Sequence, residues 1–195
     1  MDLNWKYEKV SDIYGEMSEV MPSLNNISWE RLNEEDGVTY PCDSPKVPGN
    51  DIIFSEGYPT KDKRGKIVPA QLISPDEIPN DEYPLILSTG RLLEHWHTGA
   101  ITRRSELLNS LEPEAIVCMN ALDMTNLNID PGQKVQISTR RGKIEVFVRK
   151  DWQLPSGMIF MPFCYSEAAA NILTNPQLDP IGKIPEFKFC AAKVS

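Results

Sequence analysis

The sequence lacks clustered cysteines and contains only two histidines. Because iron–sulfur clusters and structural zinc ions are held by closely spaced cysteines, we expect neither kind of site in this chain. Scattered thiols are typical of a reducing compartment, so we expect reduced cysteines and a cytoplasmic protein. The four cysteines are Cys42, Cys118, Cys164 and Cys190, and no two of them form a Cys-x-x-Cys pair.

Long apolar runs are also missing. No run approaches the roughly 20 residues that a membrane-spanning helix needs, and the first residues do not resemble a signal peptide. We therefore expect no membrane span.

The net charge of −8 makes nucleic acid an unsuitable partner. Residues 1–82 hold 17 acidic and 8 basic side chains, whereas residues 83–195 hold 11 and 12. The cations of the second part gather around residues 91–104 and 140–150, which leaves an anionic small molecule as a candidate ligand.

Residues 1–82 are predicted to be a lead-in of short helices and irregular chain. Val10–Met21 has apolar residues at helical spacing, with Ser11 or Asp12 as a cap and Pro22 as the end. A second short helix should begin near Ser28. Prolines and glycines interrupt residues 36–82, a connector in which short strands could form at Asp51–Phe54 and Lys66–Leu72.

Residues 83–195 are predicted to form a small closed β-barrel with short helices. Asn120 should cap the second helix, which is expected to bury Leu122 and Leu127. The predicted helices are Thr102–Leu111 and Ala121–Leu127. The predicted strands are Tyr83–Ser88, Ala115–Met119, Lys134–Thr139, Ile144–Val148, Gly157–Met161 and Phe187–Val194.

The most unusual stretch, Ser88–Ser105, directly follows a predicted strand. It holds both histidines, three arginines, two glycines and five hydroxyl side chains. Glycine backbone, arginine forks and hydroxyl groups together suit an anion, and Trp96 with the imidazoles suits a flat heterocycle. The alternatives that need no ligand are that Arg103 and Arg104 begin a solvated helix and that Trp96 belongs to the core. A zinc site at His95 and His97 is disfavoured because no third ligand is near.

Two further groups of residues could line a ligand-binding site. After the strand ending near Pro162, aromatic and small residues lead to Asn171, whose amide can bind a donor and an acceptor on a purine or pterin edge. Alanine-rich packing that merely closes the barrel is the alternative. The hairpin of residues 140–143, Arg-Arg-Gly-Lys, could bind phosphate, but a solvated hairpin tip is favoured by composition.

These residues resemble a known family. The segment Thr89-Gly90-Arg91-x-x-Glu94-His95-Trp96-His97-Thr98-Gly99-x-x-Thr102-Arg103-Arg104-Ser105 is similar to the signature that opens the C-terminal domain of formate dehydrogenase alpha subunits, in the molybdopterin oxidoreductase superfamily. The resemblance continues through residues 168–175 and 183–191, and residues 28–32 resemble the segment just ahead of that domain. It implies a double-psi six-stranded β-barrel, aspartate-decarboxylase-like, over residues 83–195.

The resemblance implies that the barrel binds molybdopterin guanine dinucleotide, carrying molybdenum or tungsten. The cofactor-binding residues that it implies are Thr89, Gly90, Arg91, His95, Trp96, His97, Thr102, Arg103, Phe163, Asn171, Phe187 and Lys188. Arg91, Thr89 and Gly90 would make pyrophosphate and backbone contacts at the strand end. His95, Trp96 and His97 would face the pterin or the edge of the catalytic pocket. The pterin and nucleotide walls would be completed by Phe163, Asn171, Phe187 and Lys188. No catalytic or metal-binding residue is expected in this chain.

The implied function is the two-electron oxidation of formate to carbon dioxide by a larger enzyme. In the family, the iron–sulfur cysteines, the metal ligand and the catalytic histidine lie upstream of everything matched here, so the chain alone should be inactive. It would be a fragment or a split subunit, with the N-terminal part of the catalytic subunit and electron-transfer subunits as partners.

The alternatives are the same domain of another superfamily member, such as an assimilatory nitrate reductase, and a non-catalytic barrel that binds a protein partner or acts in metal insertion. The sequence does not distinguish molybdenum from tungsten. It also leaves open whether the acceptor is NAD, ferredoxin or a hydrogenase.

Overall fold

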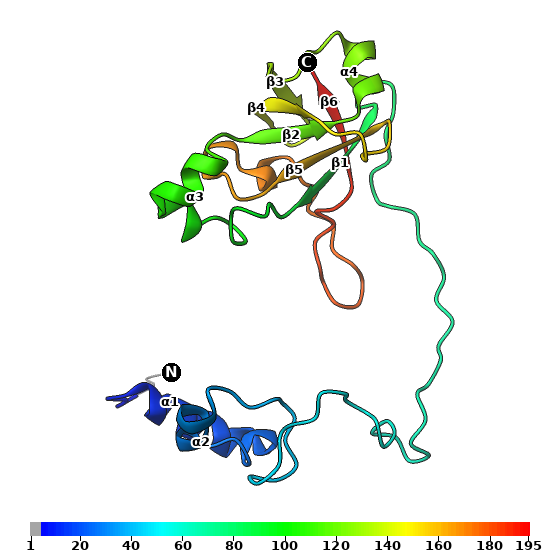
Figure 1. Ribbon diagram of the computed structural model, residues 1–195. Coiled ribbons are helices and arrows are strands. Elements are labelled where there is room, and N and C mark those ends of the chain that lie inside the picture. Colours follow the sequence, from blue (N-terminus) through cyan, green and yellow to red (C-terminus); the bar gives the residue numbers. More distant parts are fainter. Residues whose placement is uncertain (1–4) are drawn as a thin grey trace. The chain divides into compact units, whose positions relative to one another are not determined.

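The computed structural model describes residues 5–195, which fall into two compact units, Met1–Ala70 and Gln71–Ser195 (Figure 1). Residues 71–82, expected from the sequence to belong to the lead-in, group with the barrel unit. Among the described residues, no helix is both long and apolar enough to cross a membrane.

The first unit contains the two predicted helices, α1 (Val10–Val20) and α2 (Trp29–Glu35), separated by the 3-10 turn η1 (Pro22–Leu24). Helix α1 starts at Val10 as predicted, but the predicted cap at Ser11 or Asp12 is wrong, because the N-cap is Lys9. The Asp12 carboxylate instead accepts hydrogen bonds from the backbone N–H groups of Glu8 (2.9 Å) and Lys9 (3.0 Å). Ser28 caps α2 as predicted, since its Oγ accepts from the Arg31 N–H at 3.1 Å.

The connector in this unit contains turns where strands were considered. Residues 51–54 form a series of turns, and residues 66–70 have no regular structure. A strand needs a neighbour for its backbone groups, and the side chains of Ile67 and Leu72 are fully exposed. The prediction of strands at Asp51–Phe54 and Lys66–Leu72 is therefore wrong.

The second unit is a closed, mixed, six-stranded β-barrel, which confirms the predicted architecture (Figure 1). The strands follow one another around the barrel in the order β1-β5-β2-β4-β3-β6. Two neighbouring pairs, β1 with β5 and β2 with β4, are parallel, and the other pairs are antiparallel. The strand bounds are β1 Leu85–Gly90, β2 Ile116–Met119, β3 Lys134–Ser138, β4 Lys143–Lys150, β5 Met158–Pro162 and β6 Cys190–Val194.

Alternating apolar side chains fill the barrel. On β3 and β4 the buried residues are those that the alternation predicted, including Val135, Ile137 and Val146. Leu87 of β1 lies opposite Ile159 of β5, and neither has any exposed surface. Because the interior is packed with these side chains, groups that bind a ligand must lie at strand ends and in loops.

The short helices lie outside the strands, with α3 and α4 on opposite sides of the barrel in Figure 1. They are η2 (Thr102–Arg104), α3 (Glu106–Leu111), α4 (Ala121–Leu127), η3 (Ser166–Ala168) and η4 (Ala170–Ile172). The single helix predicted over 102–111 is divided at Ser105, whose extended backbone (φ −85°, ψ 116°) makes it the N-cap of α3.

Helix α4 has the predicted bounds and the predicted cap, Asn120, but not the predicted buried face. Leu122 is 67% exposed and Leu127 40% exposed, while Asp123 and Met124 are buried. Polar contacts explain why this face of α4 is buried. The Asp123 carboxylate accepts hydrogen bonds from the Ser156 hydroxyl (2.6 Å) and the Gly157 N–H (2.8 Å). These bonds turn the Asp123 side of α4 toward the barrel.

Glu77 fastens the chain ahead of β1 to the barrel. Its carboxylate accepts hydrogen bonds from both terminal nitrogens of Arg141 and from the Ala191 N–H, the last at 2.7 Å. Arg140 is a further ion-pair partner at 3.3 Å. Burial raises the pKa of the Glu77 carboxyl, but the bonds from Arg141 and Ala191 lower it more, so that the pKa lies below its ordinary value.

From the contact of Glu77 with Arg141 and Ala191 we expect the stability of the fold to depend on pH. Because the folded pKa is lowered, the contact stabilises the fold fully above the ordinary glutamate pKa of about 4.3 and loses its effect as the pH falls through the lowered value. Glu77→Gln should reduce the free energy of unfolding by about 2 kcal/mol at neutral pH and flatten this acid dependence. Urea unfolding across a pH series measures both effects, with the exposed Glu82→Gln as the control. Equal curves for the two variants would refute the assignment.

Candidate functional site

The two ligand-like stretches of the sequence begin side by side. Strands β1 and β5 are parallel neighbours, with Thr89 opposite Met161 and Gly90 opposite Pro162. The carboxyl ends of neighbouring parallel strands lie at the same edge, so the chain after Gly90 and the chain after Pro162 leave the barrel together. The Phe163 N–H donates to the Gly90 carbonyl at 3.1 Å, which ties the two stretches to each other.

Three predicted site residues on the first stretch present their side chains to solvent. Arg91 is exposed and makes no ion pair with any other described residue. Trp96 is 75% exposed. His97 has a left-handed backbone (φ 50°), and its ring lies edge-on to Phe163 with 5.3 Å between ring centroids. A guanidinium, an indole and an imidazole on a phenyl ring are thus available to a ligand.

The C-terminal segment joins the same edge through two crossed hydrogen bonds. The Thr89 hydroxyl donates to the Phe187 carbonyl at 2.6 Å, and the Lys188 ammonium group donates to the Thr89 carbonyl. These contacts also correct the predicted strand Phe187–Val194, since β6 begins only at Cys190. Phe187 and Lys188 are bonded to the end of β1 instead of extending β6.

Three other predicted residues direct their polar groups into the protein. His95 is buried, and its Nε2 lies 2.9 Å from the Glu112 carbonyl oxygen. The Thr102 hydroxyl oxygen accepts from the Trp96 N–H at 3.0 Å. The Arg103 guanidinium donates to the Pro113 carbonyl (2.8 Å), pairs with Glu167 and lies 4.7 Å from the centre of the Tyr165 ring. These three groups shape the loop from within.

Asn171 is exposed on η4, and no hydrogen bond links its side chain to another described residue. No hydrogen bond or ion pair among the described residues joins its side chain to the edge formed by β1 and β5. The nearby Asn175 is buried, and its amide donates to Glu186 (2.8 Å) and to the Phe189 carbonyl (3.3 Å). Asn175 therefore holds the chain that leads to β6.

The hairpin of residues 140–143 is not a solvated tip, contrary to the interpretation favoured from composition. Arg141 makes the paired hydrogen bonds with Glu77, and its Nε donates to the Leu173 carbonyl at 2.9 Å. Arg140 lies over the Tyr83 ring, 4.9 Å from its centre. Both guanidinium groups therefore bind parts of this chain.

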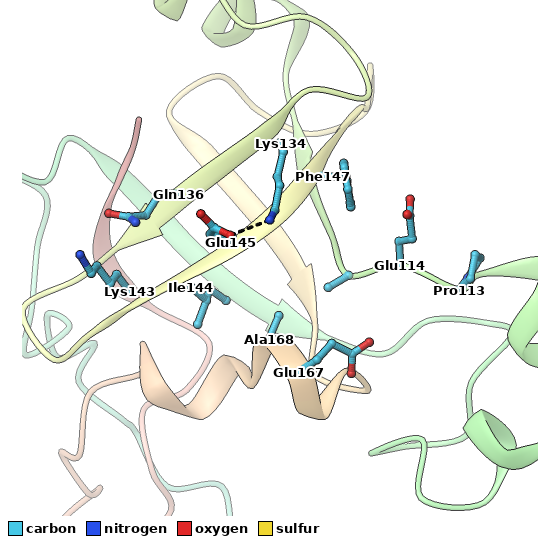
Figure 2. A pocket seen from close by; sticks show the side chains of 11 residues that line it. Pro113, Glu114, Lys134, Gln136, Lys143, Ile144, Glu145, Phe147, Glu167 and Ala168 are labelled. Carbon is cyan, nitrogen blue, oxygen red and sulfur yellow. Dashed lines mark ion pairs between the residues drawn. The ribbon is translucent and has the colours of Figure 1, made fainter.

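A cavity of about 580 Å³ lies away from this edge, between the outer face of the β3–β4 hairpin and η3 (Figure 2). Its walls carry both signs of charge, with the Lys134–Glu145 ion pair (2.6 Å) on one side and Glu167 on the other. None of the predicted cofactor-binding residues lines it. It offers no concentration of positive charge for an anionic ligand.

Burial governs the titration of the groups next to the site. It raises the pKa of the Cys164 thiol and of the Tyr165 hydroxyl. It also raises the pKa of Cys190 to about 11. At neutral pH these groups are protonated, so the two cysteines pack as small apolar side chains and Tyr165 serves as a hydrogen-bond donor.

Glu112 is the residue whose importance the sequence did not indicate. Its carbonyl oxygen accepts from both His95 and Tyr165 (3.2 Å from the Tyr165 hydroxyl), and its carboxylate takes two hydrogen bonds from Arg149 at 2.7 and 3.0 Å. A backbone carbonyl is present at every residue, so no sequence pattern could reveal this role.

Almost the entire chain is similar in sequence to parts of known proteins. It is 40% identical over 190 residues to the F420-dependent formate dehydrogenase 1 subunit alpha of Methanococcus maripaludis. It is 38% identical over 190 residues to the F420-dependent formate dehydrogenase subunit alpha of Methanocaldococcus jannaschii, and 30% identical over 197 to the assimilatory nitrate reductase catalytic subunit of Bacillus subtilis. Each match covers 97% of this chain but only 28% of the relative.

The fold also has a relative among solved structures. The acetylene hydratase of Pelobacter acetylenicus superposes with a TM-score of 0.53 over 58% of this chain and 18% of that chain, at 20% sequence identity. Such a likeness shows the fold alone. Residues 85–191, from the first residue of β1 into β6, match the family described as the molydopterin dinucleotide binding domain. This chain therefore belongs to the family of molybdopterin dinucleotide-binding domains.

Proposed function

We propose that the chain is the C-terminal, cofactor-binding portion of the alpha subunit of a formate dehydrogenase and that it binds molybdopterin guanine dinucleotide. The observation that carries this proposal is the shared edge of β1 and β5. There Arg91 and the His97–Phe163 ring pair leave the barrel from two parallel strands, fixed together by the Phe163–Gly90 hydrogen bond. The family match supports the class of cofactor.

The residues at this edge fit the dinucleotide chemically. A pyrophosphate needs a cation that the protein has not already neutralised, and Arg91 is exposed and unpaired among the described residues. A pterin needs flat or apolar walls, which Trp96, His97 and Phe163 supply. His95, Thr102 and Arg103 would support this wall from inside the protein.

Beside these walls, Thr89, Gly90, Phe187 and Lys188 would form the base of the site. Their mutual hydrogen bonds fix the end of β1, so the backbone there is held in place before a ligand arrives. Asn171 would contact the nucleotide from η4. When bound, the dinucleotide would carry the metal that takes two electrons from formate, while this chain holds and orients the dinucleotide.

Formate is favoured over nitrate because identity to the formate dehydrogenase subunits, 40% and 38%, exceeds the 30% identity to the nitrate reductase. The chain spans 28% of the length of these relatives, so the remaining catalytic machinery would come from the rest of the alpha subunit. The two formate dehydrogenase relatives are named as F420-dependent, so F420 is proposed as the final electron acceptor of this enzyme. It was not among the acceptors considered from the sequence. The free cysteines favour a cytoplasmic enzyme.

The proposal is tested by producing the chain together with the rest of the same alpha subunit. We expect the purified complex to release a fluorescent oxidised pterin and GMP in equal amounts, and to reduce a dye with formate. The chain alone should show no formate-dependent dye reduction. A folded, stable complex without pterin would contradict the proposal and leave the partner-binding barrel as the function.

A further inference from the structure

The carbonyl oxygen of Glu112 is a second point, besides the Phe163–Gly90 hydrogen bond, at which the two halves of the proposed site are joined. It accepts one hydrogen bond from His95, on the stretch after β1, and one from Tyr165, on the stretch after β5. The two donor rings also contact each other edge-on, with 5.9 Å between centroids. Both side chains have about 1% of their surface exposed, so water competes little for either bond.

Glu112 is itself held in place from two directions. Its carboxylate is fixed by the two-pronged contact with Arg149 of β4, which raises the pKa of the Arg149 guanidinium through the hydrogen bonds to Glu112. The next carbonyl, of Pro113, accepts from Arg103. The acceptor for His95 is thus anchored to the barrel, and His95 connects the loop to that anchor.

The backbone reverses direction immediately after His95. The Gly99 N–H donates to the Trp96 carbonyl at 2.9 Å, and both His97 (φ 50°) and Gly99 (φ 74°) have left-handed backbones. Glycine adopts this conformation freely, but for His97 it is unfavourable unless the surroundings hold it. His95 points inward while Trp96 and His97, the next two residues, point to solvent, so the anchoring of His95 decides the direction of both exposed rings.

We propose that His95 is a positioning residue, whose Nε2–H bond to the Glu112 carbonyl sets the Arg91–Gly99 loop for the dinucleotide without His95 itself touching it. This inference rests on the proposed cofactor function. A carbonyl can only accept, so the His95 proton is on Nε2. Its Nδ1 is buried and has no hydrogen-bond partner among the described residues, and a second proton there would be a buried donor without an acceptor.

The tautomer can be observed without any cofactor. The sequence contains only two histidines, so isotope-labelled histidine gives two imidazole spectra by NMR, and His97, the exposed one, serves as an internal reference. We expect the His95 ring to carry its proton on Nε2 and this proton to exchange slowly. A His95 proton on Nδ1 would overturn the inference.

Two substitutions of nearly equal size separate positioning from packing. His95→Gln keeps an N–H donor near the Nε2 position, whereas His95→Met fills the space without a donor. In the complex with the rest of the alpha subunit, His95→Met should retain about fivefold less pterin and GMP after dialysis, which is the effect of one hydrogen bond on an equilibrium. His95→Gln should retain nearly the wild-type amount.

Tyr165→Phe provides a second test, because it removes only the other bond to Glu112. Like His95→Met, it should lower pterin retention. If His95→Met does not fold, Tyr165→Phe still tests whether the hydrogen bonds to the Glu112 carbonyl position the loop. Equal retention by wild type, His95→Met and Tyr165→Phe would overturn the positioning role while leaving the proposed function intact. A wild-type complex that is folded but carries no pterin would overturn both.

Discussion

Replacing Arg91 with alanine is expected to lower dinucleotide retention about 10- to 100-fold, the range for losing a charge-assisted contact with phosphate. The reason is that Arg91 is exposed beside the β1–β5 edge and has no carboxylate partner among residues 5–195. Its charge is therefore available to a pyrophosphate. The measurement is the pterin and GMP released per complex, together with the loss of pterin during dialysis at rising salt.

The control for this prediction is Arg64→Ala, which removes an exposed arginine from the other unit. It changes the net charge equally and should leave retention unchanged. Arg91→Lys keeps the charge without the two-pronged geometry and should fall between the two. If Arg91→Ala and Arg64→Ala retain the same amount of pterin, Arg91 does not bind the pyrophosphate.

Much of the local structure in both units could be predicted from sequence patterns. The alternation on β3 and β4 identified their buried faces, because one side of each strand must face the interior. Asn120 and Ser28 identified two helix starts, since a side-chain oxygen there satisfies a free backbone N–H. These are short-range effects, and the sequence contains all the information that they need.

The errors arise where a distant residue decides the local structure. The buried face of α4 depends on Asp123 meeting Ser156 and Gly157, more than thirty residues away. The hairpin arginines depend on Glu77, in a segment that the sequence assigned to the lead-in. Polar contacts between distant residues leave no periodic pattern in the sequence. The sequence therefore predicted that α4 would bury its leucines and that the hairpin arginines would be solvated.

For the candidate site, too, the sequence predicted local features but not contacts between distant residues. The strand ends that carry the candidate residues could be predicted, and the resemblance supplied the set of residues proposed to bind the cofactor. The direction of each side chain could not, because the inward turn of His95 and Arg103 depends on carbonyl groups at Glu112 and Pro113. Neighbours in one motif therefore divide between exposed side chains that a ligand can reach, such as Trp96, and side chains directed into the protein, such as His95.

Gly99→Ala is expected to destabilise the barrel by about 2 to 4 kcal/mol, combining backbone strain with overpacking. Gly99 has a positive φ of 74°, and an added Cβ would lie 2.6 Å from the Cys164 carbonyl oxygen. A backbone atom cannot rotate away as a side chain can, so the loop after β1 would have to separate from the stretch after β5. Dinucleotide retention should therefore fall together with stability.

Gly132→Ala separates the two causes, because Gly132 has a similar φ of 82° but no heavy atom within 4 Å of an added Cβ. It should cost only the strain, about 1 kcal/mol, and leave dinucleotide retention unchanged. Urea unfolding followed by hydrogen exchange in β1 and β5 reports on the barrel without contributions from the first unit. If the two variants lose equal stability and retain equal pterin, Gly99 is needed only for its backbone conformation. If Gly99→Ala loses more stability than Gly132→Ala and is the only one of the two to lose pterin, the cofactor site requires the close approach of the two stretches.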